Sequence, residues 1–376
     1  MEALILSCGT GGGHNAAGRA MLEALERRGH RAAMFNPYTL KSETAALRID
    51  NAYIRVAQCA PRAFGAIYEL GNLWRRLPGY SPVYYANGLM VDRMEEFLSK
   101  NHFDVVLMPH LFPAEILTHL KRRGLKVPKM IFVATDYTCI PFTEEPDCDA
   151  YVIPSEELRP EFLSWGIPAD RIAPLGIPVS RRFSRPISRD EAASLLGLDP
   201  EKRYILVSGG SIGAGNVAAI LRSLCRLYRF DENTRIVAIC GSRSELSAQL
   251  RDEYGERVLI LDHTDWMDAY LRLSDVYLTK PGGLSSTEAA VMGVGLLHIA
   301  PIPGCETRNV AFFTKHGMSL AVDRQPGTLR RAIAEVEDPE LRRRMIDNQH
   351  RWVPGDAADQ ICRLAERLTG ETPKND

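Results

Sequence analysis

The chain has 376 residues, too many for one comfortable hydrophobic core, and this length predicts two domains. A formal net charge of -1 argues against a nucleic-acid partner, which would need a strongly basic surface. No stretch approaches the roughly 18 consecutive apolar residues of a membrane span, and the N-terminus lacks signal-peptide features, so we expect a cytoplasmic protein whose eight cysteines are reduced.

Short apolar runs alternate with helical patterns in the first part of the chain. The predicted strands are ALILSC, RAAMF, FDVVLMP, PKMIFVATD and AYVIPS. Between the first two strands, Ala17, Met21 and Leu25 recur on one face of a predicted helix. This alternation is typical of a parallel sheet with helices on both faces. Residues 37–101 lack strong strand patterns, so we predict a helical insertion there.

A segment rich in proline and arginine begins near residue 176 and predicts a linker with a short helix. The alternation then restarts with RYILVSGG, TRIVAIC, RVLILD, DVYLTK and GLLHIAP. We therefore predict an α/β protein with two Rossmann-like, doubly wound domains, residues 1–185 and 186–352. We expect residues 353–376 to form a helix that packs back on the N-terminal domain. Open parallel sheets bind ligands beyond the carboxyl ends of their strands, so the cleft between the domains is the expected site.

A glycine-rich turn, GTGGGHN, follows the first predicted strand at residues 9–15. Such a turn lets the backbone approach an anion closely. A dinucleotide site would also need an acid at the end of the second strand, but Asn36 and Pro37 stand there, and no GK[ST] marks a P-loop. A turn whose glycines serve only tight packing is the plainer alternative.

Two further glycine-rich segments lie in the second half of the chain. VSGGSIGAGN, residues 207–216, is suited to hold a diphosphate at a helix N-terminus. KPGGLSST, residues 280–287, places glycines and hydroxyls at another helix start, and Glu288 follows where a carboxylate can accept both ribose hydroxyls. Glu306 and Asn309 share a helical face and are suited to bind sugar hydroxyls. Ordinary helix capping also explains residues 285–288.

These motifs resemble those of family 28 glycosyltransferases. KPGGLSSTEA followed by PIPGCETRN is similar to the part of that family that binds the sugar donor. The resemblance narrows to the monogalactosyldiacylglycerol synthase and processive diacylglycerol glucosyltransferase branch through GTGGGHNAAGRAMLEAL, FVATDYTCIP, DAYVIPSEEL and LGIPVSRRF. It implies a GT-B fold, in which two Rossmann-like domains face each other across a cleft. The acceptor would bind the N-terminal domain and a UDP-sugar the C-terminal domain.

The resemblance also implies roles for individual residues and ligands. Glu288 would bind the ribose, Glu306 and Asn309 the sugar, and His263 would lie near the uracil. The residues implied around the diphosphate are Gly210, Ser211, Gly282, Gly283 and Ser286. The implied ligands are UDP-glucose or UDP-galactose and diacylglycerol or a related lipid. The chain departs from lipid-synthase relatives at residues 139–142, CIPF, where those often carry a His and a Trp.

Enzymes of this family invert the anomeric carbon, so the acceptor hydroxyl must lose a proton as it attacks. We predict that His14 is the general base, because a neutral imidazole suits that role at cytosolic pH. Asp136 is predicted to orient His14, and His110 is a second candidate in the acceptor region. The glycine-rich turn, with Gly12 and Gly13, is then predicted to leave room above its backbone, where the sugar donor and the acceptor meet.

We expect no metal and no cofactor, because helix N-termini and glycine amides can stabilise the leaving UDP. The triplet Asp147-Cys148-Asp149 resembles a metal-binding Asp-x-Asp motif of another glycosyltransferase fold. It follows two other acids, and we interpret it as a solvated turn.

The helical insertion mixes arginines with aromatic residues, including Trp74, Arg75 and Arg76. Cations suit anionic lipid headgroups and aromatic rings suit the membrane interface, so we predict peripheral association with an anionic membrane surface. An insertion packed on its own domain with exposed arginines is the alternative. Three other functions remain open: a UDP-sugar 2-epimerase, a lipid I N-acetylglucosaminyltransferase-like enzyme, or a non-catalytic nucleotide-sugar-binding protein. The lipophilic insertion favours the lipid transferase over the epimerase.

Overall fold

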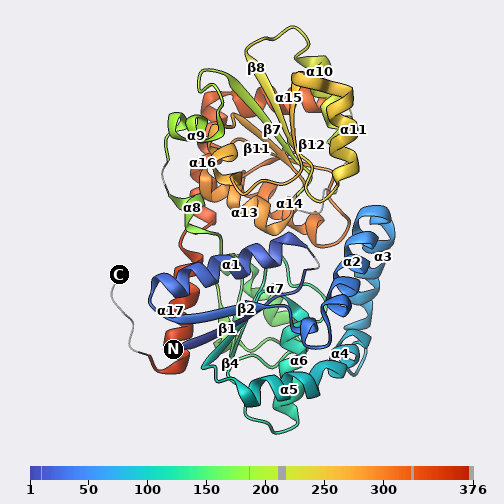
Figure 1. Cartoon of the computed structure of the whole chain (residues 1–376), viewed down its shortest axis with the longest axis vertical. Coiled ribbons are helices and arrows are strands. Elements are labelled where there is room, and N and C mark those ends of the chain that lie inside the picture. The colour runs from blue at the N-terminus through green and yellow to red at the C-terminus, as the bar shows by residue number, and fades with distance from the viewer. Residues whose placement is uncertain (10, 186, 211–216, 323–325, 372–376) are drawn as a thin grey trace. The chain divides into compact units, whose positions relative to one another are not determined.

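The computed structural model describes residues 1–9, 11–185, 187–210, 217–322 and 326–371 (Figure 1). The chain forms two compact units. The first unit comprises Met1–Val56, Ala60–Arg181 and Asp356–Asp376, and the second comprises Ala57–Cys59 and Arg182–Gly355. The final segment returns to the first unit, so the chain begins and ends in the same unit.

A parallel sheet forms the centre of the first unit. Its strands are β1 (Glu2–Leu6), β2 (Arg31–Phe35), β3 (Val105–Met108), β4 (Lys129–Val133), β5 (Ala150–Val152) and β6 (Ile172–Ala173), in the order β2-β1-β3-β4-β5-β6. In the register, Ile5 pairs with Leu107, and Leu107 pairs with Ile131. Because the strands are parallel, their carboxyl ends lie at one edge of the sheet, and the turns that follow β1, β3 and β4 meet there.

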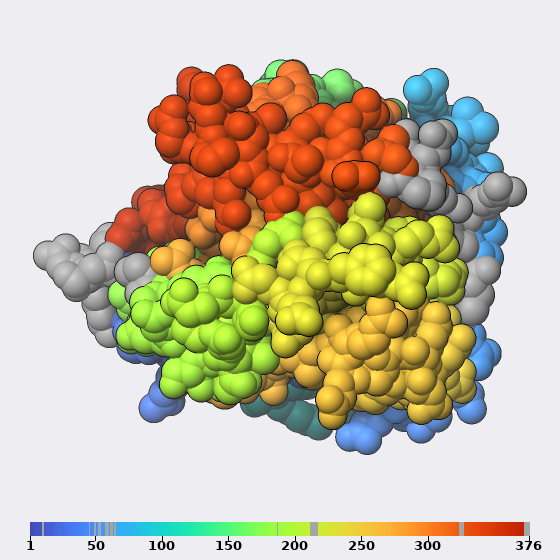
Figure 2. All heavy atoms as spheres, turned by 90° about the horizontal axis from the view of Figure 1, so that it is seen from above, coloured from blue at the N-terminus to red at the C-terminus, as the bar shows by residue number. Residues whose placement is uncertain are grey.

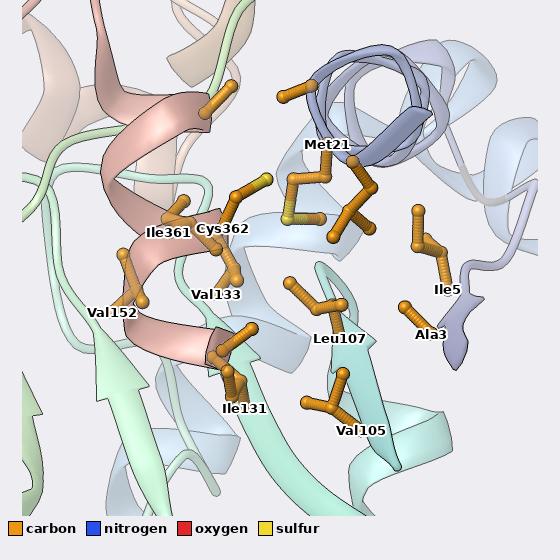
Figure 3. Packing of buried hydrophobic residues seen from close by; sticks show 14 of the residues in the cluster. Ala3, Ile5, Met21, Val105, Leu107, Ile131, Val133, Val152, Ile361 and Cys362 are labelled. Atoms are coloured by element: carbon orange, nitrogen blue, oxygen red, sulfur yellow. The ribbon is translucent and has the colours of Figure 1, made fainter. Parts of the chain in front are cut away.

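The hydrophobic core of the first unit lies between this sheet and two helices from opposite ends of the chain (Figure 3). The helices of this unit outside the insertion are α1 (Gly12–Arg27), α6 (Leu111–Arg122), α7 (Arg159–Ser164) and α17 (Ala357–Thr369), with 3₁₀ turns η3 (Glu156–Leu158) and η4 (Ala169–Arg171). Met21 of α1 and Ile361 of α17 pack against Ile5 and Leu107 of the sheet. The apolar face predicted for α1 is therefore buried.

A buried ion pair also holds α17 in place. Both oxygens of the fully buried Glu366 carboxylate accept from the Arg28 guanidinium, at 2.9 and 3.1 Å, and Oε1 lies 2.8 Å from His30 Nε2. Burial alone would raise the pKa of Glu366, but the hydrogen bonds from Arg28 and His30 outweigh it and lower the pKa. The N-terminal ammonium adds a contact to Glu371 at 2.6 Å.

The insertion between β2 and β3 is helical. It consists of η1 (Pro37–Leu40), α2 (Glu43–Cys59), α3 (Pro61–Trp74), α4 (Pro82–Asn87), η2 (Gly88–Met90) and α5 (Val91–Lys100). Proline occupies the first turn of α3 and of α4, where its missing N–H costs nothing, and the Ser81 hydroxyl caps α4 by accepting from the Tyr84 N–H at 3.0 Å. A Cβ on Gly71 of α3 would lie 3.2 Å from Pro141, so glycine permits close packing of α3 on that segment.

The second unit is also built on a parallel sheet. Its strands are β7 (Arg203–Ser208), β8 (Thr234–Ile239), β9 (Val258–Leu261), β10 (Val276–Thr279), β11 (Leu296–Ile299) and β12 (Leu320–Val322), in the order β12-β11-β10-β7-β8-β9. The central strands β7 and β10 pair Ser208 with Thr279, so the glycine-rich turns after both strands start side by side.

Helices follow most strands of the second unit. Figure 2 shows a face of this unit on which the green, yellow and gold segments adjoin. The helices are α8 (Arg181–Ser184), α9 (Arg189–Leu196), α10 (Val217–Leu227), α11 (Ser244–Tyr254), α12 (Met267–Leu273), α13 (Gly283–Met292), α14 (Cys305–Lys315), α15 (Pro326–Glu337) and α16 (Pro339–Trp352), with the 3₁₀ turn η5 (Gly255–Arg257). The predicted α/β class with two doubly wound parallel sheets is confirmed. Within the described ranges, no helix has the length and apolar character needed to cross a bilayer.

Candidate active site

His14 lies in the first turn of α1, beside the end of β3. Its Nδ1 is 2.8 Å from the backbone oxygen of Pro109. A carbonyl oxygen can only accept a hydrogen bond, so Nδ1 carries the proton in the neutral ring. The basic lone pair is therefore on Nε2, and the main chain selects the tautomer.

Two residues after β4 complete the surroundings of His14. The Thr135 hydroxyl lies 3.1 Å from Nδ1. Burial lowers the pKa of His14, while the charge of Asp136 and the hydrogen bond to Pro109 oppose this effect without cancelling it. The imidazole is thus neutral near pH 7, as a general base must be. Asp136 was predicted from the sequence but Thr135 was not, although Thr135 directly precedes Asp136 after the same strand.

His110, the second candidate, lies two residues after the end of β3. It is the N-cap of α6, and its Nδ1 accepts from the Phe112 N–H at 3.2 Å. Its ring meets the His14 ring edge-on with centroids 4.6 Å apart. Burial, reinforced by the neighbouring His14, lowers the pKa of His110 well below its ordinary value. These contacts indicate that His110 caps α6 and packs beside His14, and they do not favour a role as a base.

The glycine-rich turn after β1 contacts a carboxylate from the helical insertion, Asp50. Gly12 and Gly13 are the first residues of α1. A Cβ on Gly9 would lie 2.4 Å from Asp50 Oδ2, and the Asp50 carboxylate accepts from Asn36 at 3.1 Å. Burial raises the pKa of Asp50. This carboxylate, supplied by α2, would repel a diphosphate at the turn, which agrees with the interpretation that the turn holds no nucleotide.

The predicted membrane residues of the insertion separate into two kinds. Trp74 and Arg76 are exposed. The Arg75 side chain is fully buried, pairs with Glu144, donates to the Cys139 backbone oxygen at 3.1 Å and stacks 3.6 Å from the Trp165 ring centre. The prediction that Arg75 meets lipid headgroups is therefore wrong for this structure: Arg75 ties α3 to its own unit.

In the second unit, glycines begin the turns where the diphosphate is predicted to bind. Gly210 follows β7 with φ at +69°, a conformation that favours glycine, and its N–H donates to Ser208 Oγ at 3.1 Å. Ser211 lies outside the described residues. Gly282 is the N-cap of α13 and Gly283 is its first residue, so both are at the positive end of the helix.

The helix α13 turns Ser286 away from the predicted diphosphate position. Ser286 is fully buried, and its hydroxyl is 2.9 Å from His298 Nε2, while the opposite ring nitrogen lies 3.0 Å from Ser319 Oγ. Burial lowers the pKa of His298 to about 3, so the ring stays neutral. The prediction that the Ser286 side chain contacts the diphosphate is wrong here. Ser285 and Glu288 are partly exposed and share the other side of the helix.

The predicted sugar-binding residues contact groups of their own chain. The Glu306 carboxylate accepts from the Ile302 N–H at 2.9 Å and pairs with the Lys280 ammonium. The Asn309 amide donates to the Pro281 backbone oxygen at 2.9 Å. Glu306 and Asn309 are both buried, next to the turn that carries Gly282. Lys280 belongs to the KPGG motif, but no role was predicted for it from the sequence.

His263, predicted near the uracil, is exposed on the turn after β9, 3.7 Å from Asp265. No group of three or more metal-ligating side chains occurs among the residues that the structure describes.

The Asp147-Cys148-Asp149 triplet is not the solvated turn that we predicted. Asp147 pairs with Lys121 at 2.9 Å and Arg171 at 2.6 Å, and the Asp149 carboxylate accepts from the Met130 N–H at 2.9 Å.

Comparison with known proteins supports the motif resemblance. A family model described as monogalactosyldiacylglycerol (MGDG) synthase matches residues 14–179. The processive diacylglycerol beta-glucosyltransferase of Bacillus licheniformis is 24% identical over 358 residues, covering 92% of this chain and 89% of the relative. The relative with the same name from Bacillus subtilis is 25% identical, and the match covers 68% of this chain and 66% of the relative. The one from Staphylococcus carnosus is 30% identical, and the match covers 62% of this chain and 59% of the relative.

Solved structures with low sequence identity share the fold. MurG of Acinetobacter baumannii has a TM-score of 0.61 at 14% identity, covering 97% of this chain and 99% of MurG. The glycotransferase of kitacinnamycin has a TM-score of 0.67 at 15% identity, with coverage of 98% and 99%. A putative UDP-N-acetylglucosamine 2-epimerase from Listeria monocytogenes has a TM-score of 0.66 at 15% identity, with coverage of 100% and 99%. The predicted GT-B fold and the resemblance to the MGDG synthase branch are confirmed.

Proposed function

We propose that this glycosyltransferase, similar to MGDG synthases and processive diacylglycerol glucosyltransferases, transfers a hexose from UDP-glucose or UDP-galactose to diacylglycerol. The transfer inverts the anomeric carbon and needs no metal. The observation that carries the proposal is the arrangement of His14, whose Nδ1–H is committed to the Pro109 oxygen and whose Nε2 is left as the base. The names of the curated relatives support the lipid acceptor.

In the proposed reaction, the acceptor hydroxyl oxygen attacks the anomeric carbon while its proton passes to Nε2 of His14. The bond between the anomeric carbon and the diphosphate oxygen breaks, and its electron pair leaves with UDP. The charge of Asp136 favours the imidazolium that forms, because it raises the pKa of His14. The lowered pKa keeps the resting ring neutral and ready to accept the proton.

The second unit supports the proposed sugar donor through the start of α13. The Gly282 N–H donates to the Lys280 backbone oxygen at 2.9 Å, so the Gly283 N–H and the helix dipole are what favour an anion at that end. Ser285 and Glu288 lie on the same partly exposed side of the helix, where a hydroxyl and a carboxylate can receive a diphosphate and a ribose. No metal is needed if these groups neutralise the leaving group.

The helix α3 supports peripheral membrane association. Ile67, Leu70, Leu73 and the following Leu77 are between 54% and 60% exposed. Gly71 of the same helix is buried against Pro141, whereas these large aliphatic side chains are in solvent. This is the reverse of an ordinary surface helix, and it suits burial in the interface of a membrane. We propose that this face binds the cytoplasmic surface of the membrane that holds the lipid acceptor.

One activity screen tests the proposed function. The protein is incubated with UDP-glucose, UDP-galactose or UDP-N-acetylglucosamine, each with and without diacylglycerol liposomes and with excess EDTA. We expect a hexosyl lipid by mass, a β-linkage by NMR from the α-configured donor, and no loss of rate with EDTA. A new UDP-sugar epimer formed without lipid would instead support an epimerase. UDP binding without turnover under all conditions would support a non-catalytic binding protein.

A further inference from the structure

Lys280 lies at the centre of the predicted sugar-donor half-site. It directly follows β10, the strand that pairs with β7. A Cβ on Gly210 would lie 2.7 Å from Lys280 Cε, and a Cβ on Gly282 would lie 3.3 Å from its Nζ. The lysine side chain therefore runs against both glycine-rich turns, and side chains at either position would displace it.

The ammonium of Lys280 forms a nearly buried ion pair. The side chains of Lys280 and Glu306 are only 12% and 8% exposed, and Nζ pairs with Glu306 Oε1. Burial of a charge is unfavourable unless the charge is paired, so each of these two groups stabilises the other. A second anion brought to the glycine turns would compete with Glu306 for the same ammonium.

We propose that Lys280 is a catalytic residue that binds the diphosphate of the UDP-sugar and stabilises the charge of the departing UDP. This inference rests on the proposed function and adds a charge to it that the glycine amides do not supply. When the bond between the anomeric carbon and the diphosphate oxygen breaks, its electron pair adds negative charge beside the Lys280 ammonium. The acceptor hydroxyl meanwhile forms the new bond to carbon and gives its proton to His14.

The same arrangement links diphosphate binding to sugar binding. In this structure, one oxygen of Glu306 pairs with Lys280 and the other accepts from the Ile302 N–H. When the diphosphate shares the ammonium, Glu306 Oε1 becomes available to accept from a sugar hydroxyl. Lys280 thus controls when the predicted sugar-binding carboxylate is free to act.

The decisive measurement compares UDP with uridine, which lacks the diphosphate. Calorimetric Kd values are measured for both ligands with the full-length wild type, Lys280→Met and Lys280→Arg. A hydrogen bond to a charged group contributes enough to change the UDP affinity of Lys280→Met by about 10- to 100-fold. We expect that loss for UDP, unchanged uridine affinity, and partial recovery in Lys280→Arg. A lysine with only a structural role would weaken both ligands equally or neither.

A second variant guards against misfolding. Lys280→Met leaves Glu306 without its buried partner, so Lys280→Met with Glu306→Gln removes both charges together. Retained uridine binding shows that the site is folded, and a lost preference for UDP in this double variant supports the proposal. An unchanged preference for UDP, together with an unchanged kcat in Lys280→Met, would overturn it. If the wild type itself fails to bind UDP, the proposed function fails instead.

Discussion

The exposed face of α3 makes a quantitative prediction about membrane binding. Ile67→Gln, Leu70→Gln and Leu73→Gln, combined in one variant, replace three outward aliphatic side chains by a polar residue with good helix propensity. Because these positions have more than half of their surface in solvent, we expect the free energy of unfolding to change by no more than about 0.5 kcal/mol per substitution.

The size of the effect follows from the exposed surface. Full burial of a Leu or Ile side chain contributes about 1.5–3 kcal/mol. The three side chains are 60%, 59% and 59% exposed, so burying what remains exposed contributes about 1–2 kcal/mol each. The sum, about 3–5 kcal/mol, corresponds to a loss of roughly 100- to 5000-fold in vesicle partitioning.

Liposome flotation over a range of lipid concentrations measures the partition coefficient. The matched control is Phe230→Gln, which removes an 88% exposed aromatic side chain from the second unit and should leave partitioning unchanged. Transfer to diacylglycerol dispersed in detergent should keep its kcat in the triple variant, since the site is untouched. A triple variant that floats like the wild type would refute the assignment of this face to the membrane.

Three further predictions concern charged groups. The acid limb of kcat/KM should have an apparent pKa below 6.5, and Asp136→Asn should lower this pKa further because the Asp136 charge raises the pKa of His14. His14→Ala should reduce kcat by about 10²- to 10⁴-fold. An acid limb that Asp136→Asn leaves unchanged would argue against His14 as the base. Arg75→Met should lower the free energy of unfolding in urea by about 3–5 kcal/mol, because it breaks the buried pair with Glu144. Arg76→Met should lower only binding to anionic vesicles. Equal free energies of unfolding for the two variants would contradict the buried pair. The partners of Glu366 lower its pKa from 4.5, so its contribution to stability is complete above the pKa of the unfolded chain and is lost as the pH falls through the pKa of the folded protein. Glu366→Ala should be less stable than the wild type at pH 7 and should lack this acid dependence. Unfolding curves at several pH values measure both effects.

The repeating alternation of apolar runs and helices predicted the fold because parallel strands buried on both faces leave a strong local signal. β1, with the sequence EALIL, and β7, with RYILVS, are examples. The patterns did not predict β6 or β12, which have two and three residues. Both strands are defined by their pairing with β5 and β11, which is a property of the assembled sheet rather than of the local sequence.

The candidate site was less predictable at the level of single side chains. Ser285 and Ser286 are neighbours with the same chemistry, and only the packing of α13 against His298 shows that Ser286 is the buried one. Arg75 looked like a headgroup ligand because its partner Glu144 is 69 residues away in the sequence. Asp50 reaches the glycine turn from a separate helix in the same way. Short motifs identify the turns, but contacts between distant segments decide which side chains face them.

The hydrogen bond from His14 to the Pro109 oxygen has a consequence for how the site tolerates mutation. In a triad built from side chains, one substitution can remove the acid that sets the tautomer of the histidine. Here the acceptor belongs to the peptide backbone, which every amino acid carries, so no single substitution at position 109 can delete it. Random mutagenesis of the segment after β3 should therefore yield variants with changed rates or stability but with the proton still on Nδ1. The orientation of this proposed base therefore depends on the path of the chain rather than on the identity of a residue.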